Sequence, residues 1–277
     1  MRFWKMHGLG NDYVVIDDRR ESIEGKNLSI LARSLCKRNF SVGADGLLLV
    51  CNSENADIKM RIFNADGSEA EMCGNGIRCL AKYCYDNKIV GKNIMDIETL
   101  AGTRHVEVLT EGKRIANVRV DMGTPSFNRK DIPMIGQGEC IDEPMLVAGG
   151  ELNVTCLSMG NPHCVTFVAD VKSAPVQELG PRLEKHTDFP EGTNVEFVSI
   201  QTREEIHLRT WERGVGETSA CGTGACASVA AAHRLNKTGK RVRVNLLGGI
   251  LFVELDDTII LEGPAEKVFE GQLFSDD

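Results

Sequence analysis

The apolar residues of this chain fall mostly into short runs that are rich in β-branched side chains and are separated by glycine-bearing turns. In the first half of the chain these runs are 13–16, 47–51, 58–63, 93–98, 104–109 and 115–120. Short runs of this composition are typical of strands. We therefore expect each half of the chain to form a mainly antiparallel sheet.

A few segments have the helical period instead. Apolar residues occur at i, i+3, i+4 and i+7 in 77–84, and the segment 225–232 is small or apolar on nearly every side. The segments 28–35 and 176–183 show the apolar stripe of a short surface helix. A helix without a polar face belongs in the interior, so each sheet is predicted to curl around one central helix.

The chain also contains an internal repeat. Cys73-Gly74-Asn75-Gly76 recurs as Cys221-Gly222-Thr223-Gly224, 148 residues later (221 − 73 = 148). Further segments align at the same or a nearly equal offset: 10–11 with 160–161, 28–35 with 176–183, 47–50 with 195–198, and 61–64 with 209–212. A repeat of this length indicates the duplication of a whole domain.

The predicted fold is therefore α+β, with two pseudo-symmetric domains that each wrap a mainly antiparallel β-sheet or barrel round a central helix. The N-terminal repeat is placed at 1–121 and the C-terminal repeat at 122–266. The boundary lies near the start of an irregular region rich in proline and glycine, 124–150, whose later part can supply a strand to the second half. The tail, 267–277, is predicted to pack back on the first repeat.

Composition narrows the function classes. A chain of 277 residues with 42% hydrophobic and 26% charged residues is suited to two soluble globular domains. Its net charge of −8 argues against nucleic-acid and anionic-membrane partners. Since no apolar run approaches the length of about 18 residues that a membrane span needs, and no signal pattern is present, we expect a cytoplasmic protein with reduced cysteines.

The repeated motif places a cysteine directly before a helix. The free N–H groups of a helix start attract anions, and a cysteine there has its pKa lowered from about 8.5 toward neutrality. One such cysteine is more often a buried structural residue. Two in equivalent positions, Cys73 and Cys221, favour a shared function.

Two facing cysteines suit inversion at a carbon atom. Removal of an amino acid's α-hydrogen requires a base on one face, an acid on the other and stabilisation of the carboxylate as it becomes enediolate-like. A thiolate, a thiol and two helix starts supply all three, in a site that lies in the cleft between the repeats.

At this point the chain resembles the diaminopimelate epimerases, a pyridoxal-phosphate-independent family of lysine and peptidoglycan-precursor biosynthesis. The resemblance covers nearly the whole chain. It is carried by the motifs KMHGLGND at 5–12, FNADGS at 63–68, MCGNG at 72–76, MGNPH at 159–163, ERG at 212–214 and ACGTG at 220–224.

The resemblance implies an isomerase that converts LL-2,6-diaminopimelate to meso-diaminopimelate without a cofactor or a metal. Cys73 and Cys221 would be the acid/base pair. The reacting carboxylate would be bound by the backbone N–H groups of Gly74, Asn75, Gly222 and Thr223. The small substrate is the only partner expected, and the sequence leaves the oligomeric state open, with a homodimer among the alternatives.

The second amino-acid head of diaminopimelate needs a distal clamp, for which Arg213 and Glu212 have suitable chemistry. By resemblance, four asparagines also hold the substrate: Asn11, Asn64, Asn161 and Asn194. His163 is a supporting candidate, although a lone histidine is more often structural. One departure from the family pattern is Asp45-Gly46, where many members have glutamine after the aspartate, so that contact is expected to be absent or made by water.

Other functions are less well supported. Gly8-Leu9-Gly10 lacks the third glycine of a dinucleotide site, and no phosphate-binding loop is present. A thiol-redox or zinc protein normally has Cys-Xaa-Xaa-Cys, which this chain lacks. Proline racemases and the phenazine-related isomerases are nearer alternatives; Asn75 and the pair Glu212-Arg213 favour diaminopimelate over a cyclic amino acid.

Overall fold

The computed structural model describes residues 1–20, 23, 27–112, 114–147 and 150–274. The chain divides into two compact units, of which the first is Met1–Asp121 with Glu262–Asp277 and the second is Met122–Leu261. The predicted second repeat therefore runs a few residues past the end of the second unit. Residues 275–277 of the predicted tail, and 148–149 of the irregular region, lie outside the described residues.

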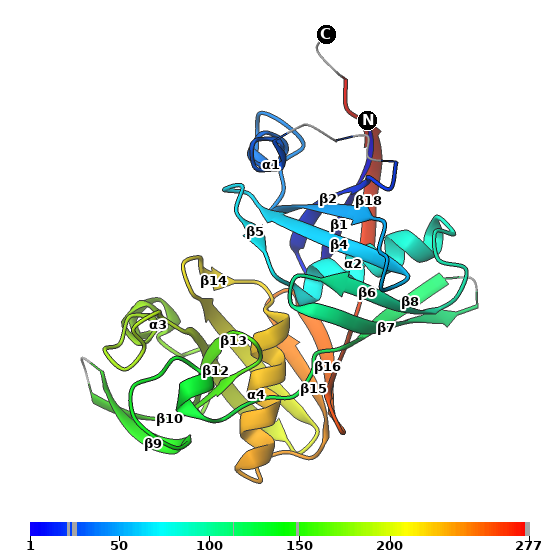
Figure 1. Ribbon diagram of the computed structural model, residues 1–277. Helices are drawn as coiled ribbons and strands as arrows, with labels where there is room; N and C mark the ends of the chain where they lie inside the picture. The colour runs from blue at the N-terminus through cyan, green and yellow to red at the C-terminus, as the bar shows by residue number, and fades with distance from the viewer. Residues whose placement is uncertain (21–22, 24–26, 113, 148–149, 275–277) are drawn as a thin grey trace. The chain divides into compact units, whose positions relative to one another are not determined.

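The first unit is a curled sheet around helix α2 (Gly74–Asp86), which contacts β1, β2, β3, β4, β7 and β8 (Figure 1). The strands are β1 (Arg2–Gly8), β2 (Asn11–Asp17), β3 (Gly46–Cys51), β4 (Ile58–Asn64), β5 (Glu69–Ala70), β6 (Ile94–Thr99), β7 (Gly102–Glu111), β8 (Arg114–Asp121) and β18 (Glu266–Gln272). They pair in the order β18-β1-β2-β3-β4-β6-β7-β8, with β5 beside β4. Only the pairs β2–β3 and β4–β6 are parallel.

The apolar run of β3 is continuous because the strand is covered on both faces. Leu47 and Leu49 pack in a cluster with helix α1 (Leu28–Cys36). Leu48 faces α2, since a side chain at Gly76 would approach it to 3.3 Å. The same run therefore holds the surface helix and the central helix.

The second unit repeats this architecture around helix α4 (Gly222–Arg234). Its elements are η1 (Arg129–Asp131), β9 (Cys140–Val147), β10 (Gly150–Ser158), β11 (Pro162–Phe167), α3 (Val176–Glu184), β12 (Asn194–Thr202), β13 (Glu205–Glu212), β14 (Gly216–Thr218), β15 (Arg241–Leu246) and β16 (Gly249–Leu255). The strands pair in the order β9-β10-β11-β12-β13-β15-β16, with β14 beside β13, and again only two pairs, β11–β12 and β13–β15, are parallel. The last strand before the tail, β17 (Ile259–Gly263), runs across the division between the units.

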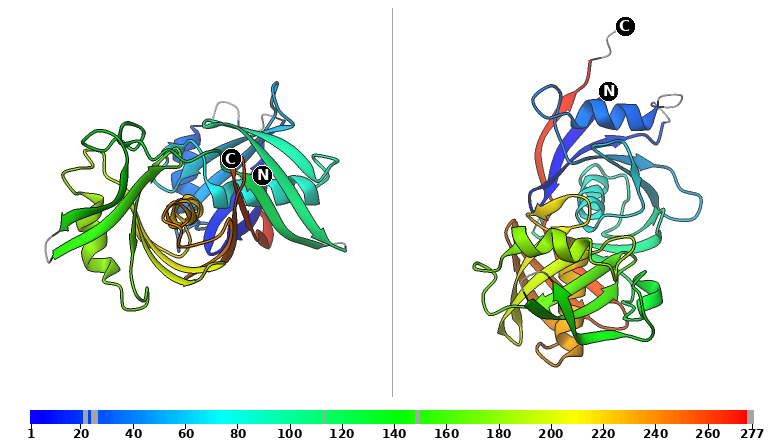
Figure 2. Two further views of the ribbon diagram at one scale, coloured as in Figure 1. Left: turned by 90° about the horizontal axis from the view of Figure 1, so that it is seen from below. Right: turned by 90° about the vertical axis from the view of Figure 1, so that its left-hand side faces the viewer.

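The two units thus have the same strand order and the same parallel pairs, which confirms the predicted pseudo-symmetric α+β fold. In Figure 2, α2 is seen end-on inside its strands in the right-hand view, and α4 inside its strands in the left-hand view. Strand β9 pairs with β10 as β18 pairs with β1. The later part of the irregular region therefore supplies a strand to the second unit, as expected.

Strand β1 has no counterpart among the predicted strands. Its apolar alternation is interrupted by Lys5, which is buried although charged. The Lys5 ammonium is held by the Asp12 carboxylate at 2.6 Å and by the Gly43 carbonyl. Because the ion pair allows a cation to occupy an inward position, the strand lacks the regular apolar alternation from which strands are predicted.

Among the described helices, none combines the length and apolar character needed to cross a membrane. All ten cysteines are free thiols.

Candidate active site

Each unit presents one cysteine at the start of its central helix. Cys73 is the N-cap of α2 and Cys221 the N-cap of α4, both with extended backbone. The glycine three residues after Cys221 is required by space, because a side chain at Gly224 would come within 2.8 Å of the Glu196 carboxylate. The structure therefore places both predicted cysteines at helix starts.

In the first unit the Cys73 sulfur lies among neutral polar groups. Its Sγ is 2.9 Å from the Tyr13 hydroxyl and 3.9 Å from Asn11 Oδ1. The same Asn11 oxygen accepts hydrogen bonds from Tyr13 and from Asn75 Nδ2, the latter at 3.2 Å. Two predicted substrate-binding residues, Asn11 and Asn75, thus lie beside Cys73.

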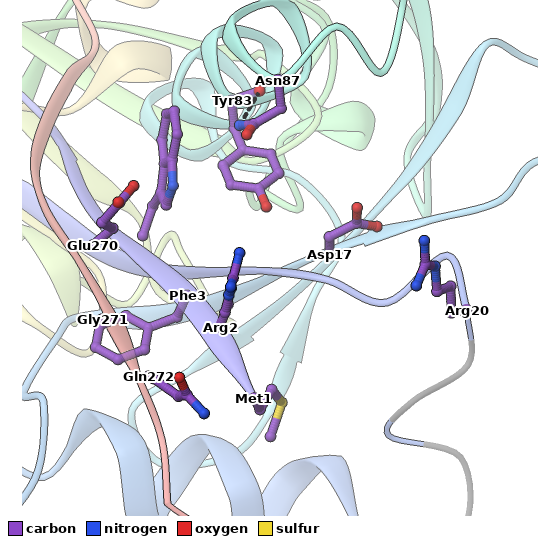
Figure 3. A pocket seen from close by; sticks show the side chains of 11 residues that line it. Met1, Arg2, Phe3, Asp17, Arg20, Tyr83, Asn87, Glu270, Gly271 and Gln272 are labelled. Carbon is purple, nitrogen blue, oxygen red and sulfur yellow. Dashed lines mark hydrogen bonds between the residues drawn. The ribbon is translucent and has the colours of Figure 1, made fainter.

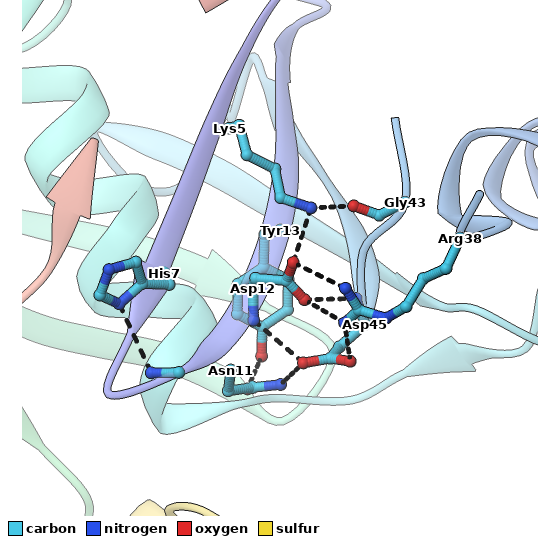
Figure 4. Close-up of polar contacts among 9 residues, drawn as sticks. Lys5, His7, Asn11, Asp12, Tyr13, Arg38, Gly43 and Asp45 are labelled. Carbon is cyan, nitrogen blue, oxygen red and sulfur yellow. Dashed lines mark hydrogen bonds and ion pairs between the residues drawn. The ribbon is translucent and has the colours of Figure 1, made fainter. Parts of the chain in front are cut away.

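A network of the charged side chains of Arg38, Asp12 and Asp45 fixes the position of the Asn11 side chain (Figure 4). Asn11 Nδ2 donates to Asp45 Oδ2 at 2.9 Å, and Arg38 binds both Asp45 and Asp12 at 2.7 Å. Burial by itself would raise the pKa of Asp12, but hydrogen bonds from Arg38 and Lys5 outweigh it and lower that pKa to about 2. Asp12 is therefore ionised at neutral pH.

In the second unit the Cys221 sulfur is buried near carboxylates. Its Sγ accepts from the Gly224 N–H at 3.4 Å and lies 3.5 Å from Thr223 Oγ1. Burial, followed by the charges of Glu212 and Glu196, raises the pKa of the Cys221 thiol well above its usual range. The expectation that a helix start lowers a thiol's pKa is wrong for Cys221, because lost hydration and two carboxylates outweigh the helix start.

A buried, hydrogen-bonded pair of side chains, His163 and Glu196, lies near this second cysteine. His163 Nδ1 is 2.8 Å from Glu196 Oε1, and both side chains are fully buried. The other ring nitrogen of His163 lies 3.0 Å from Asn161 Oδ1, and Asn161 Nδ2 donates to Thr223 Oγ1 at 3.3 Å. The predicted residues Asn161, His163 and Thr223 thus form one connected group.

Asn194 and Arg213 belong to the same unit. Asn194 Nδ2 donates to the Pro162 carbonyl at 2.9 Å, and its Oδ1 accepts from the Arg213 backbone N–H at 3.0 Å. The exposed guanidinium of Arg213 donates to the Glu191 carbonyl at 3.1 Å. Its charge is therefore available to an anion.

Glu212, predicted for the distal ammonium clamp, also has close contacts within its own unit. Its carboxylate accepts from Thr218 Oγ1 at 2.5 Å and is hydrogen-bonded to Cys221. Burial raises the pKa of Glu212, with these hydrogen bonds acting in the opposite direction. The carboxylate is therefore an immediate neighbour of the candidate acid/base.

Asn64 stands apart from the Cys73 group. It is exposed at the end of β4, where its Nδ2 donates to Ser68 Oγ at 2.9 Å. The structure thus gathers Asn11, Gly74 and Asn75 around Cys73, and Asn161, His163, Asn194, Glu212, Arg213, Gly222 and Thr223 in the unit of Cys221.

Two residues at these sites are not among those assigned from the sequence. Tyr13 and Glu196 were read only as strand residues. A signal existed for both, because Tyr13 has the repeat position of His163, and Glu196 has that of the buried Leu48 (196 − 48 = 148). The prediction of an absent or water-mediated contact at Gly46 is not tested, but the position has a packing requirement as well: a side chain there would lie 3.2 Å from the Tyr13 ring and 2.9 Å from the Phe63 carbonyl.

A separate pocket of about 1020 Å³ lies in the first unit, between β1, β18 and the end of α2 (Figure 3). Its lining includes Arg2, Trp4, Tyr83 and Glu270, and none of the candidate residues. Among the described residues, no group of three or more His, Cys, Asp and Glu side chains is placed to hold a metal ion.

Solved structures define the class of fold. A phenazine biosynthesis protein from Bacillus anthracis has a TM-score of 0.72 at 19% identity, covering 99% of each chain. A probable proline racemase from Agrobacterium radiobacter K84 has a TM-score of 0.71 at 18% identity, covering 99% of this chain and 93% of that one. The chain therefore has the two-unit α+β fold of these proteins.

Sequence similarity identifies the family within this fold. The model of the diaminopimelate epimerase family matches residues 3–128 and 155–268. The diaminopimelate epimerase of Moorella thermoacetica is 50% identical over 275 residues, which is 98% of each chain. The chain belongs to the diaminopimelate epimerase family.

Proposed function

We propose that this protein inverts one α-carbon of LL-2,6-diaminopimelate to give the meso isomer, with Cys73 and Cys221 as the acid/base pair. The proposal rests on one structural feature that occurs in both units. Each of two equivalent units presents a cysteine at the N-cap of its central helix. Membership of the diaminopimelate epimerase family supports the choice of substrate.

The reaction balances with these two groups alone. A thiolate takes the α-proton from one face, and the electrons of the broken C–H bond pass into the carboxylate as an enediolate. The second cysteine then donates its thiol proton to the opposite face, so the carbon is inverted and one thiol has exchanged roles with the other. A proton transfer of this kind involves no change in oxidation state.

In this proposal one thiol reaches each face of the reacting carbon. N–H groups of Gly74 and Asn75 from α2, and of Gly222 and Thr223 from α4, bind the reacting carboxylate. Helix starts suit this role because their N–H groups and dipoles favour negative charge, which grows on the carboxylate in the transition state.

The surroundings of the two cysteines indicate which of them is protonated at the start of the reaction. Burial and nearby carboxylates raise the pKa of Cys221, so this residue holds its proton at neutral pH and begins as the acid. Cys73 then begins as the base. In this starting state the Glu212 carboxylate accepts a hydrogen bond from the Cys221 thiol. When the roles are reversed, Cys221 is the thiolate left by the forward reaction, and Cys73 is the thiol that donates.

The distal head group is assigned to the exposed guanidinium of Arg213, which can bind a carboxylate with two hydrogen bonds. Asn194 fixes the Arg213 backbone through its Oδ1. Asn64, Asn161 and Asn194 are the proposed polar contacts to the rest of the substrate. We place the reaction in the cytoplasm, which suits an enzyme whose ten cysteines are all free thiols.

The test is incubation of the purified protein with LL-diaminopimelate in D2O without added cofactor, followed by NMR. We expect loss of the α-proton signal together with appearance of the meso isomer. The Cys51→Ser protein is a matched control, because Cys51 is a partly buried thiol on β3 and has no role in the proposal. Absence of both exchange and meso product in the wild-type protein would contradict the proposed function.

A further inference from the structure

We propose that Tyr13 is a positioning residue for Cys73, whose hydroxyl turns between Asn11 and the sulfur according to whether Cys73 is a thiol or a thiolate. The inference rests on the proposed function for the role of Cys73. It is carried by the Tyr13 hydroxyl, which contacts both Cys73 Sγ, at 2.9 Å, and Asn11 Oδ1.

The direction of these hydrogen bonds is fixed by the charged network. Asp45 can only accept, so the Asn11 amide must turn its Nδ2 toward Asp45 and its Oδ1 toward Tyr13. Asn75 is fixed in the same way, because its Oδ1 accepts from Arg78 and its Nδ2 must therefore face Asn11. The atom that Tyr13 meets at Asn11 is thus an acceptor.

A phenol has only one proton to donate. When Cys73 is a thiol, the Tyr13 hydroxyl donates to Asn11 Oδ1 and its oxygen accepts from the S–H. When Cys73 is a thiolate, the same hydroxyl turns and donates to Sγ. Asn11 Oδ1 keeps its hydrogen bond from Asn75 in that state, so the turn leaves no buried acceptor unpaired.

The phenol is held in place and stays protonated. Tyr13 is 3% exposed, and its ring fills the space opposite Gly46, its partner across the parallel β2–β3 pair. Burial, followed by the charges of Cys73, Cys79 and Asp45, raises the pKa of Tyr13 well above its usual value. The hydroxyl therefore remains a donor over the pH range in which a thiol ionises.

The second unit does not repeat this arrangement. His163 occupies the repeat position of Tyr13 (163 − 13 = 150), but its two ring nitrogens bond Asn161 and Glu196. Hydroxyl contact with a cysteine through this strand position is therefore a property of the first unit, and its loss should act on Cys73 alone.

The experiment measures alkylation of Cys73 by iodoacetamide as a function of pH, resolved by mass spectrometry, in protein that carries Cys221→Ala to remove coupling between the thiols. Tyr13→Phe should move the midpoint for Cys73 upward by about one pH unit, the effect of losing one hydrogen bond to a charged group. Tyr83→Phe, which removes another largely buried phenol of the same unit, should leave the midpoint unchanged.

In the protein with both cysteines, Tyr13→Phe should lower kcat about tenfold with little change in KM. An unchanged midpoint for Cys73 would overturn the role of Tyr13. Lack of turnover by the wild-type protein would contradict the proposed function instead, because alkylation needs no substrate.

A second variant protects the test against a folding defect. Incorporation of 3-fluorotyrosine into protein with Tyr83→Phe and Tyr85→Phe keeps the ring and hydroxyl of Tyr13 but makes the hydroxyl a stronger donor. The midpoint for Cys73 should then move downward. A midpoint equal to that of the same protein with ordinary tyrosine would again overturn the inference.

Discussion

The two units solve the same structural problem with different chemistry. Each holds an asparagine near the start of its central helix: Asn11 beside Cys73 in the first unit, and Asn161 bonded to Thr223 in the second. The first asparagine is held by a network of Arg38, Asp12 and Asp45, whereas the second is held by the buried pair of His163 and Glu196.

The difference teaches how a duplicated site acquires two roles. The helix start, the glycines and the strand order are shared, so the backbone geometry of the two cysteines is nearly the same. What differs is the charge nearby. Cys73 contacts a neutral phenol, whereas carboxylates and burial raise the pKa of Cys221, so the shared scaffold can hold a base in one unit and an acid in the other.

The largest effect is expected from removal of either thiol. Cys73→Ala and Cys221→Ala should each lower the rate of inversion by at least about 10³-fold, because one face of the carbon loses its proton-transfer group. Cys51→Ser should retain wild-type turnover. Measurement of kcat with LL-diaminopimelate decides the matter, and near-normal turnover by either alanine variant would remove that cysteine from the mechanism.

The next largest effect is expected from the buried pair of His163 and Glu196 in the second unit. His163→Ala leaves the Glu196 carboxylate buried without its partner and should lower the free energy of unfolding by about 3 to 5 kcal/mol. Glu196→Gln, which keeps the shape and removes the charge, should cost clearly less. Urea unfolding monitors both, and equal losses in the two variants would show that the charge of Glu196 does not matter.

Removal of the exposed Arg213 guanidinium should affect substrate binding more than the rate of proton transfer. Arg213→Ala should raise KM for diaminopimelate about 10- to 100-fold with a smaller change in kcat, since a charge-assisted contact to the distal carboxylate is lost. Arg203→Ala is the matched control, because Arg203 is also exposed in this unit and also donates to a backbone carbonyl. Unchanged kinetics for Arg213→Ala would exclude it from the clamp.

The charged network of the first unit predicts a smaller, pH-dependent effect. The pKa of Asp12 is lowered from 3.8 to about 2, so its contribution to stability is present above about pH 4 and is lost as the pH falls through 2. That contribution is about 2 kcal/mol. Asp12→Asn should remove it at pH 7 and flatten the pH dependence of unfolding between pH 4 and 2.

The control for Asp12 is Asp86→Asn, which removes a surface pair with Lys82 on α2 and should cost less than about 0.5 kcal/mol. Denaturant unfolding at several pH values makes the measurement. An Asp12→Asn protein with wild-type stability at pH 7 would show that the network does not stabilise the fold.

Much of the fold could be predicted because the repeat imposes the same pattern twice. The period of apolar residues gave α2, and the apolar run at 47–51 gave β3, since both depend on burial that a sequence displays directly. Strand β1 escaped because Lys5 is buried through an ion pair with Asp12, and pairing across strands is not visible in local sequence.

The candidate site was predictable where the chemistry lies in a local motif and not where it depends on distant neighbours. Cys73 and Cys221 could be predicted because the motif that contains them occurs twice. The raised pKa of Cys221 results first from burial and then from Glu212 and Glu196, of which Glu196 is a strand residue that only the folded unit brings near it. The contact of Tyr13 with Cys73 joins residues 60 positions apart (73 − 13 = 60). The packing requirement at Gly46 was not visible in the sequence, because the Tyr13 ring that lies against it belongs to another strand.

In the proposed mechanism two thiols, one from each unit, act on opposite faces of one carbon. The most direct measurement follows α-protiated LL-diaminopimelate in D2O to low conversion and determines the isotope at the α-carbons of both the meso product and the remaining substrate. We expect deuterium at the inverted carbon of the product and protium in the remaining substrate, because the proton delivered comes from the second, solvent-exchanged thiol. Retention of the original proton at the inverted carbon would show that a single group carries it from face to face, which is incompatible with two thiols acting on opposite faces.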